Sequence, residues 1–319
     1  MRRLLFCLLA IAMLPAAGVG FAADFMINVD GRRTTSLNGR WQYIIDPYEL
    51  GYYNYRWAED QWGFFRNARP QRESDLVEYE FNDNHTLQVP GDWNTQDDRF
   101  FYYEGTMWYK KDFADPRTDR NNRLFIYFGA ANYESIVYVN GQKLGVHEGG
   151  FTPFQYEITD IVQPEGNFVV VKVDNKRRRD GVPTLNTDWW NYGGITRRVL
   201  LIEVPQVYVD DYKVQLARGD LDTIAGYVQL RGAEGPREVT LSIAEAGIEQ
   251  KLTTDAEGRA EFSIDVPGLE LWSPENPRRY EVTISSGDDT VTDLIGFRTI
   301  ETRGNRILLN GEPIFLRGV

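Results

Sequence analysis

Short runs of β-branched and aromatic residues recur along most of this 319-residue chain, and turn residues separate them. Leu124–Phe128 (LFIYF), Ser135–Val139 (SIVYV), Phe168–Val173 (FVVVKV) and Val199–Val204 (VLLIEV) each have the length and composition of a strand. Asn140-Gly141 follows one of these runs and favours a two-residue hairpin turn, because both positions adopt positive φ. Helical periodicity is nearly absent. The pattern therefore predicts an all-β chain built from antiparallel sandwiches.

Changes in pattern divide the chain into four parts. Residues 1–23 resemble a secretory signal peptide, with an arginine pair, a short apolar run and small residues near the expected cleavage site. The first set of strands occupies residues 24–205. Residues 206–300 contain short strands between turn signals, as in an immunoglobulin-like sandwich without its disulfide. In residues 301–319, Asn310-Gly311 favours a second Asn-Gly turn, and Ile314–Val319 is expected to form a buried strand.

Charge and composition argue against several classes of partner. The formal net charge is −12, and it becomes −14 once Arg2 and Arg3 are removed with the signal peptide (−12 − 2). Nucleic acid and anionic membranes are therefore poor candidates. No apolar run is long enough to span a membrane. With two histidines and one cysteine, Cys7, which lies inside the signal peptide, we expect no metal site. We expect no cofactor, because no phosphate-binding loop or dinucleotide fingerprint occurs.

The segment Leu185–Ile195 (LNTDWWNYGGI) combines groups that suit a neutral ligand rich in hydroxyls. The rings of Trp189 and Trp190 can stack on sugar rings, and the Asp188 carboxylate can accept hydrogen bonds from two hydroxyls. Asn191 is expected to fix the loop through side-chain-to-backbone bonds. The other interpretation is a core tryptophan pair with an Asp that caps the loop. Asp188, Trp189, Trp190 and Asn191 are the candidate substrate-binding residues.

Two further segments have two interpretations each. Pro47–Phe81 is an aromatic-rich insertion that could stack a longer glycan or cover the first domain or a subunit contact, and we favour a covering role. Lys176–Arg179 (KRRR) lies just before the Asp188 segment. We favour a solvated loop there, and the alternative is a cationic patch that attracts an acidic sugar such as a uronate.

Seven sequence features, in the same order, resemble the N-terminal part of glycoside hydrolase family 2, the β-galactosidase, β-glucuronidase and β-mannosidase family. They are Leu37–Tyr43 (LNGRWQY), Val89–Asn94 (VPGDWN), Glu104–Phe113 (EGTMWYKKDF), Val139–Gly141 with His147–Phe154 (HEGGFTPF), Asp188–Ile195 (DWWNYGGI), Leu271–Pro277 (LWSPENP) and Leu309–Val319 (LNGEPIFLRGV). The resemblance implies a jelly-roll, galactose-binding-like sandwich over 24–205 and an immunoglobulin-like sandwich over 206–300. Residues 301–319 would hold the first strand of a (β/α)₈ barrel, so we expect a fragment truncated at the start of the catalytic barrel.

The resemblance also implies chemistry that this chain does not contain. Family members are retaining β-glycosidases that use two carboxyl groups, which are glutamates near the ends of barrel strands. The acid/base follows an Asn, and this chain has no Asn-Glu dipeptide. We therefore assign no catalytic residue and expect the chain alone to be inactive. The resemblance implies that Asp188 contacts a sugar hydroxyl. The sequence of Asn191–Ile195 (NYGGI) looks closer to the glucuronidase branch than to the galactosidase branch.

We therefore expect the substrate-positioning and structural part of a periplasmic or secreted exo-β-glycosidase, β-glucuronidase-like slightly ahead of β-galactosidase-like. Its partner would be a carbohydrate with a terminal β-linked sugar, and the full-length protein could form a homo-oligomer. A stand-alone non-catalytic carbohydrate-binding module is the alternative, and it predicts glycan affinity without a barrel. A purely structural sandwich protein is a third reading, which predicts a stable oligomer and no glycan binding.

Overall fold

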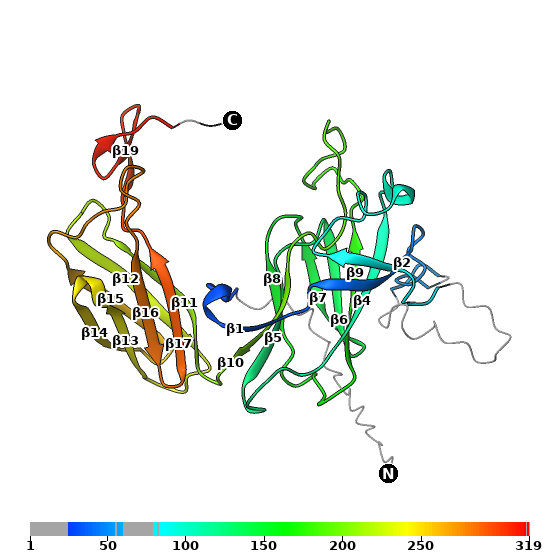
Figure 1. Cartoon of the computed structure of the whole chain (residues 1–319), viewed down its shortest axis with the longest axis horizontal. Helices are drawn as coiled ribbons and strands as arrows, with labels where there is room; N and C mark the ends of the chain where they lie inside the picture. The colour runs from blue at the N-terminus through cyan, green and yellow to red at the C-terminus, as the bar shows by residue number, and fades with distance from the viewer. Residues whose placement is uncertain (1–24, 55, 60–78, 82, 317, 319) are drawn as a thin grey trace, which may run out of the picture.

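The computed structural model describes residues 25–54, 56–59, 79–81, 83–316 and 318. These residues form two β-sandwiches followed by a small three-stranded sheet (Figure 1). The helices among the described residues are the short 3-10 turns η1 (Val29–Gly31), η3 (Asp98–Phe100) and η4 (Ala244–Ala246). No helix in the described part has the length and hydropathy needed to cross a membrane. The all-β prediction is confirmed, and the expected signal peptide lies outside the described residues.

The first sandwich packs a six-stranded sheet, in the order β3-β2-β4-β9-β6-β7, against a four-stranded sheet, in the order β1-β10-β5-β8. Its strands are β1 (Arg33–Ser36), β2 (Gly39–Ile45), β3 (Thr86–Val89), β4 (Thr106–Phe113), β5 (Arg123–Phe128), β6 (Glu134–Val139), β7 (Gln142–Glu148), β8 (Phe154–Glu157), β9 (Asn167–Asp174) and β10 (Val199–Val204). Neighbouring strands pair antiparallel, as a jelly roll requires. The main core lies between the two sheets.

The central strand β9 explains why its sequence reads as a continuous apolar run. Val169, Val171 and Val173 point into the main core, because alternate residues of a strand face the same side. Val170 and Lys172 face the other side of the sheet, which is also buried. The hairpin between β6 and β7 forms as predicted, with positive φ at both residues of Asn140-Gly141.

The outer face of the six-stranded sheet is covered by the start of the aromatic-rich insertion. Asp46 is fully buried and accepts a hydrogen bond of 3.0 Å from Trp108 Nε1. The ring of Tyr52 packs on this face, and Lys172 Nζ lies 4.9 Å from the ring centroid. Tyr48 and Trp57 remain exposed. The favoured covering role thus applies to the described part of the insertion, whereas its aromatic residues at positions 55, 62, 64 and 65 lie outside the described residues.

The second sandwich packs the sheet β11-β12-β15 against the sheet β14-β13-β16-β17 around one apolar core. Its strands are β11 (Tyr208–Leu216), β12 (Thr223–Arg231), β13 (Glu238–Ile243), β14 (Ile248–Thr253), β15 (Arg259–Asp265), β16 (Tyr280–Ser286) and β17 (Asp289–Ile295). This arrangement confirms the immunoglobulin-like prediction. Strand β14 was not predicted, because an edge strand rich in exposed polar residues lacks a clear apolar face.

The segment 25–32 lies between the two sandwiches and contacts both (Figure 1). Met26 and Val29 pack with apolar residues of β5 and β10 and with Tyr208 at the start of β11. Arg32, whose side chain is 2% exposed, donates to the backbone carbonyl of Val209 and lies 3.6 Å from the carboxylate of Asp289. One guanidinium therefore joins this N-terminal segment to two strands of the second sandwich.

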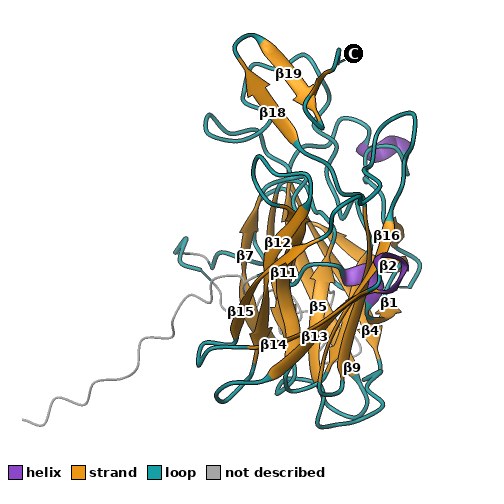
Figure 2. Cartoon of the chain, turned by 90° about the vertical axis from the view of Figure 1, so that its left-hand side faces the viewer, coloured by secondary structure: helices purple, strands orange, loops and turns teal. Residues whose placement is uncertain are grey.

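The last sheet consists of β18 (Ile300–Arg303), β19 (Arg306–Leu309) and β20 (Glu312–Pro313), and it projects beyond the second sandwich (Figure 2). Asn310-Gly311 makes the expected turn, with positive φ at both residues. The expected buried strand after this turn is not seen. Residues 314–316 have no regular structure and Phe315 and Leu316 are exposed, so their apolar side chains are not packed against a second layer.

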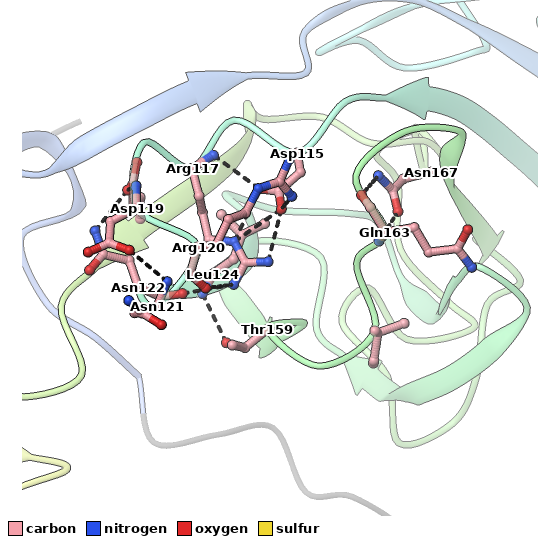
Figure 3. Close-up of polar contacts among 12 residues, drawn as sticks. Asp115, Arg117, Asp119, Arg120, Asn121, Asn122, Leu124, Thr159, Gln163 and Asn167 are labelled. Atoms are coloured by element: carbon pink, nitrogen blue, oxygen red, sulfur yellow. Dashed lines mark hydrogen bonds and ion pairs between the residues drawn. The ribbon is translucent and has the colours of Figure 1, made fainter.

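A loop at residues 114–122 of the first sandwich is held by charged side chains (Figure 3). The buried carboxylate of Asp115 pairs with Arg117 at 2.9 Å and also with Arg120. Glu203 of β10 accepts hydrogen bonds from Thr118 and Asn122 of the same loop. Arg117 and Arg120 therefore neutralise the buried carboxylate of Asp115.

Candidate functional site

The Asp188 segment lies in the long connection from β9 to β10, which crosses from one sheet of the jelly roll to the other at one end of the sandwich (Figure 1). Asp188 is exposed, and Trp189 is 57% exposed. Trp190 is half-buried, whereas Asn191 is only 2% exposed. The four candidate residues are consecutive in the chain, and their side chains change from exposed at Asp188 to buried at Asn191.

A set of buried asparagines holds the inner end of this segment. Asn191 Nδ2 donates to the carbonyl of Asn175, and Asn175 Nδ2 donates back to the carbonyl of Asn191 at 2.7 Å. Asn132 Nδ2 donates to Asn191 Oδ1 at 2.9 Å. Asn94 Oδ1 accepts from the amide of Gly193 at 2.9 Å. The amide nitrogen and the amide oxygen of Asn191 are both hydrogen-bonded within the protein, which suits the loop-fixing role. A direct sugar contact by Asn191 stays a prediction.

The two glycines after Asn191 allow the backbone to lie against the core. A Cβ on Gly193 would come within 2.1 Å of the Trp93 ring, which is fully buried. Gly194 has φ of 136° and bridges to Asn132 of the neighbouring loop. Glycine is required at Gly194 because that φ is rarely adopted by other residues. The motif Asn-Tyr-Gly-Gly is thus a fixed base from which the acid-aromatic part projects.

An aromatic cluster completes the exposed surface next to Asp188. The ring of Trp190 stacks on Phe101 with centroids 5.9 Å apart and meets Tyr102 edge-on at 5.4 Å. Phe101 and Tyr102, which follow η3, are both exposed. Trp190 packs on this cluster, whereas Trp189 faces solvent. Phe101 and Tyr102 were not among the predicted site residues, although the aromatic run FFYY at positions 100–103 is a visible signal.

The basic run before Asp188 is largely neutralised by neighbouring carboxylates. Lys176 Nζ lies 3.1 Å from Glu49, Arg177 Nε lies 2.9 Å from Glu104, and Arg178 lies 2.8 Å from Glu134. Three of its four cations therefore tie the loop to the jelly roll, rather than forming an open cationic patch. The favoured interpretation of this run was a solvated loop and the alternative was a uronate-attracting patch, and neither anticipated these ion pairs.

Glu49 connects the covering insertion to this basic run. Its carboxylate contacts Lys172 at 2.7 Å and Lys176 at 3.1 Å. Burial alone would raise the pKa of Glu49, but hydrogen bonds and the positive charges of these two lysines outweigh burial and lower the pKa. Glu49 therefore stays ionised at pH values below the usual titration range of a glutamate. Its ion pair with Lys176 holds the base of the Asp188 loop.

His147 lies near the end of strand β7, before the turn that begins after Glu148, and its ring stacks on Phe154 with the ring centroids 4.2 Å apart. Its partial burial lowers the pKa of the imidazole. Within the described residues, no three His, Cys, Asp or Glu side chains are grouped closely enough to hold a metal ion. The site thus combines a carboxylate with aromatic rings, which suits hydroxyl recognition and ring stacking.

Two family models together match most of the chain. The family model described as "Glycosyl hydrolases family 2, sugar binding domain" matches residues 34–205, and the model "Glycosyl hydrolases family 2" matches residues 207–298. A β-glucuronidase of Paenibacillus borealis is 25% identical over 316 residues, covering 90% of this chain and 49% of that protein.

Solved structures agree with the sequence comparison. A Lactobacillus rhamnosus β-glucuronidase has a TM-score of 0.70 and 29% identity, and the match covers 94% of this chain and 50% of that one. A Ruminococcus gnavus β-glucuronidase in complex with D-glucuronic acid has a TM-score of 0.69 and 27% identity, covering 93% and 51%. The chain thus spans about half the length of each of these three relatives.

Proposed function

The chain belongs to family 2 of the glycosyl hydrolases, and from this premise we propose that it supplies the sugar-contacting loop of a β-glucuronidase-like enzyme. The Asp188 carboxylate accepts hydrogen bonds from hydroxyls of the terminal sugar, and Trp189 stacks beside it. The main support for this proposal is that Asp188 is exposed in a segment whose base is fixed by buried asparagines.

The similarity to β-glucuronidases supports a β-linked uronide as the substrate. The relatives named above are β-glucuronidases, and the R. gnavus protein was solved with D-glucuronic acid. The carboxylate of Asp188 would repel the carboxylate of a uronic acid at short range, so Asp188 reads hydroxyls of the sugar ring and not its acid group. The catalytic glutamates lie outside this chain, so hydrolysis requires the barrel of a longer protein.

The test begins with the reading frame beyond the codon for Val319. If it continues into a barrel, the encoded protein is assayed on 4-nitrophenyl β-D-glucuronide and on the β-D-galactoside. We expect the glucuronide to be preferred and Asp188→Asn to lower kcat/KM roughly 10- to 100-fold, because a hydrogen bond to a charged group contributes about 1.5–3 kcal/mol. Asp180→Asn, an exposed carboxylate of the same loop, is the matched control and should change little.

A preference for the galactoside would replace the proposed substrate, and an unchanged Asp188→Asn variant would remove Asp188 from the site. If the reading frame stops at Val319, the chain is titrated with methyl β-D-glucuronide while tryptophan fluorescence is followed. Binding that Asp188→Asn abolishes would then favour the binding-module alternative.

A further inference from the structure

Arg177 donates hydrogen bonds to the backbone on both sides of Asp188. Its Nη1 donates to the carbonyl oxygen of Thr187 at 3.2 Å, and its Nη2 donates to the carbonyl oxygen of Trp189 at 3.3 Å. These are the residues immediately before and after Asp188. Its Nε donates to Glu104 Oε1 at 2.9 Å, which anchors the guanidinium on the loop that precedes β4.

Asp188 depends on its backbone for orientation. Among the described residues, no hydrogen bond or ion pair to the Asp188 side chain is found, and the side chain is exposed. Its direction is therefore set by the conformation of the peptide units around it. Two hydrogen bonds from one planar guanidinium restrict those units on both sides, and a lysine cannot supply this fork because its donors radiate from a single nitrogen.

The positive charge of Arg177 is neutralised by a carboxylate of the protein itself. Its side chain is 18% exposed, and it forms a close ion pair with Glu104. Arg179, two residues later, is exposed and makes no ion pair with the residues that the structure describes. Arg177 is therefore poorly placed to offer a free cation to a substrate carboxylate, and Arg179 serves as its natural comparison.

We propose that Arg177 is a positioning residue that holds the Asp188 carboxylate in the orientation needed to bind a sugar hydroxyl. This inference rests on the proposed function of Asp188. Holding the loop in its binding conformation before the ligand arrives favours binding, because binding then does not carry the entropy cost of ordering the loop. Removing Arg177 should leave the jelly roll folded while the Asp188 segment samples more conformations.

The first test is hydrogen exchange on the 319-residue chain. In Arg177→Ala, the amides of residues 185–190 should exchange at least several-fold faster, while strands β9 and β10 keep their protection. Arg179→Ala is the matched control and should match the unaltered chain. Unchanged exchange at 185–190 in Arg177→Ala would overturn the proposal. If Arg177→Ala does not fold, Arg177→Lys keeps the charge and should also speed exchange, because it loses the fork.

The second test is a double-substitution cycle in the enzyme that contains the barrel, on 4-nitrophenyl β-D-glucuronide. Arg177→Ala should lower kcat/KM roughly 10- to 100-fold, the range expected for a misplaced contact group. In an Asp188→Asn background the same change should have an effect below about twofold, because the residue acts through Asp188. Independent, multiplicative effects would refute positioning. An Asp188→Asn variant with full activity would instead refute the proposed function, and the exchange result would still stand as a separate observation.

Discussion

Polar side chains determine the shape of the Asp188 segment residue by residue. Asn132, Asn175 and Asn191 exchange hydrogen bonds with one another or with each other's backbone, and all three are buried. Removing the hydrogen-bond partner of a buried amide lowers the free energy of unfolding by about 1–3 kcal/mol, so the loss of any of these bonds should destabilise the protein. Each asparagine therefore has a local structural task, whereas the exposed Asp188 makes no comparable contact with the residues that the structure describes.

Glu49 makes a pH-dependent contribution to stability. Its lowered pKa means that the ionised form stabilises the fold. This contribution is fully present above the unfolded pKa of about 4.5 and is lost as the pH falls toward the folded pKa. We expect Glu49→Gln to reduce the free energy of unfolding at pH 7, and the difference from the unaltered chain to shrink as the pH falls below about 4.5.

Denaturant unfolding at several pH values between 3 and 7 checks this expectation. Glu165→Gln, at an exposed position of the same sandwich, controls for the loss of one negative charge and should change stability little at any pH. A difference between Glu49→Gln and the unaltered chain that stays constant down to pH 3 would show that ionisation of Glu49 is irrelevant.

At the scale of the element, the connection from β9 to β10 is a rigid base with an exposed tip. Its base contains Gly193 and Gly194, which lie against the buried ring of Trp93 and the backbone of Gly91. Its tip carries Asp188 and Trp189. The packed glycines hold one end of the loop against the core, and the ion pairs of the basic run hold its other end.

Gly193→Ala should damage this element by steric overlap. The added methyl group would lie 2.1 Å from the Trp93 ring, so the ring or the loop has to move. Overpacking of a core typically costs about 1–3 kcal/mol, and thermal unfolding should report a fall of several degrees. Gly181→Ala is the control, since its Cβ would make only ordinary contacts at 3.5 Å. Equal melting temperatures for the two variants would contradict this packing argument.

The whole molecule is two sandwiches joined by a segment from the N-terminal side. Residues 25–32 pack on β5 and β10 of the jelly roll, and Asn28 Nδ2 donates to Tyr212 and to the carbonyl of Thr292 in the second sandwich. Arg32 adds the buried contact with Asp289. The linker alone would allow the sandwiches to rotate, and these contacts oppose that rotation.

Arg32→Ala should uncouple the two sandwiches. Removing one partner of a buried ion pair costs about 3–5 kcal/mol, because the other charge stays buried without its partner. We expect calorimetry to show two separated unfolding transitions where the unaltered chain shows one. Lys251→Ala, which breaks an exposed pair with Glu238, should keep the single transition. A single, equally shifted transition for Arg32→Ala would mean that the segment stabilises the fold without linking its parts.

The sequence by itself determined the local features of this protein. Continuous apolar runs indicated most strands of the two sandwiches, and Asn140-Gly141 and Asn310-Gly311 indicated hairpin turns, because these signals depend on neighbouring residues only. The motif that carries Asp188 was also visible, since its acid, aromatic and glycine residues are contiguous.

Only the tertiary structure decided which residues meet across long separations in the chain. The contact of Phe101 and Tyr102 with Trp190 joins loops about ninety residues apart, and no local pattern encodes it. The tasks of Arg177 and Arg32 were equally hidden, because a basic residue in a sequence does not name its partner. Ion pairs and buried amides are satisfied by whichever groups the fold brings within about 3 Å, so their roles follow from packing and not from sequence spacing.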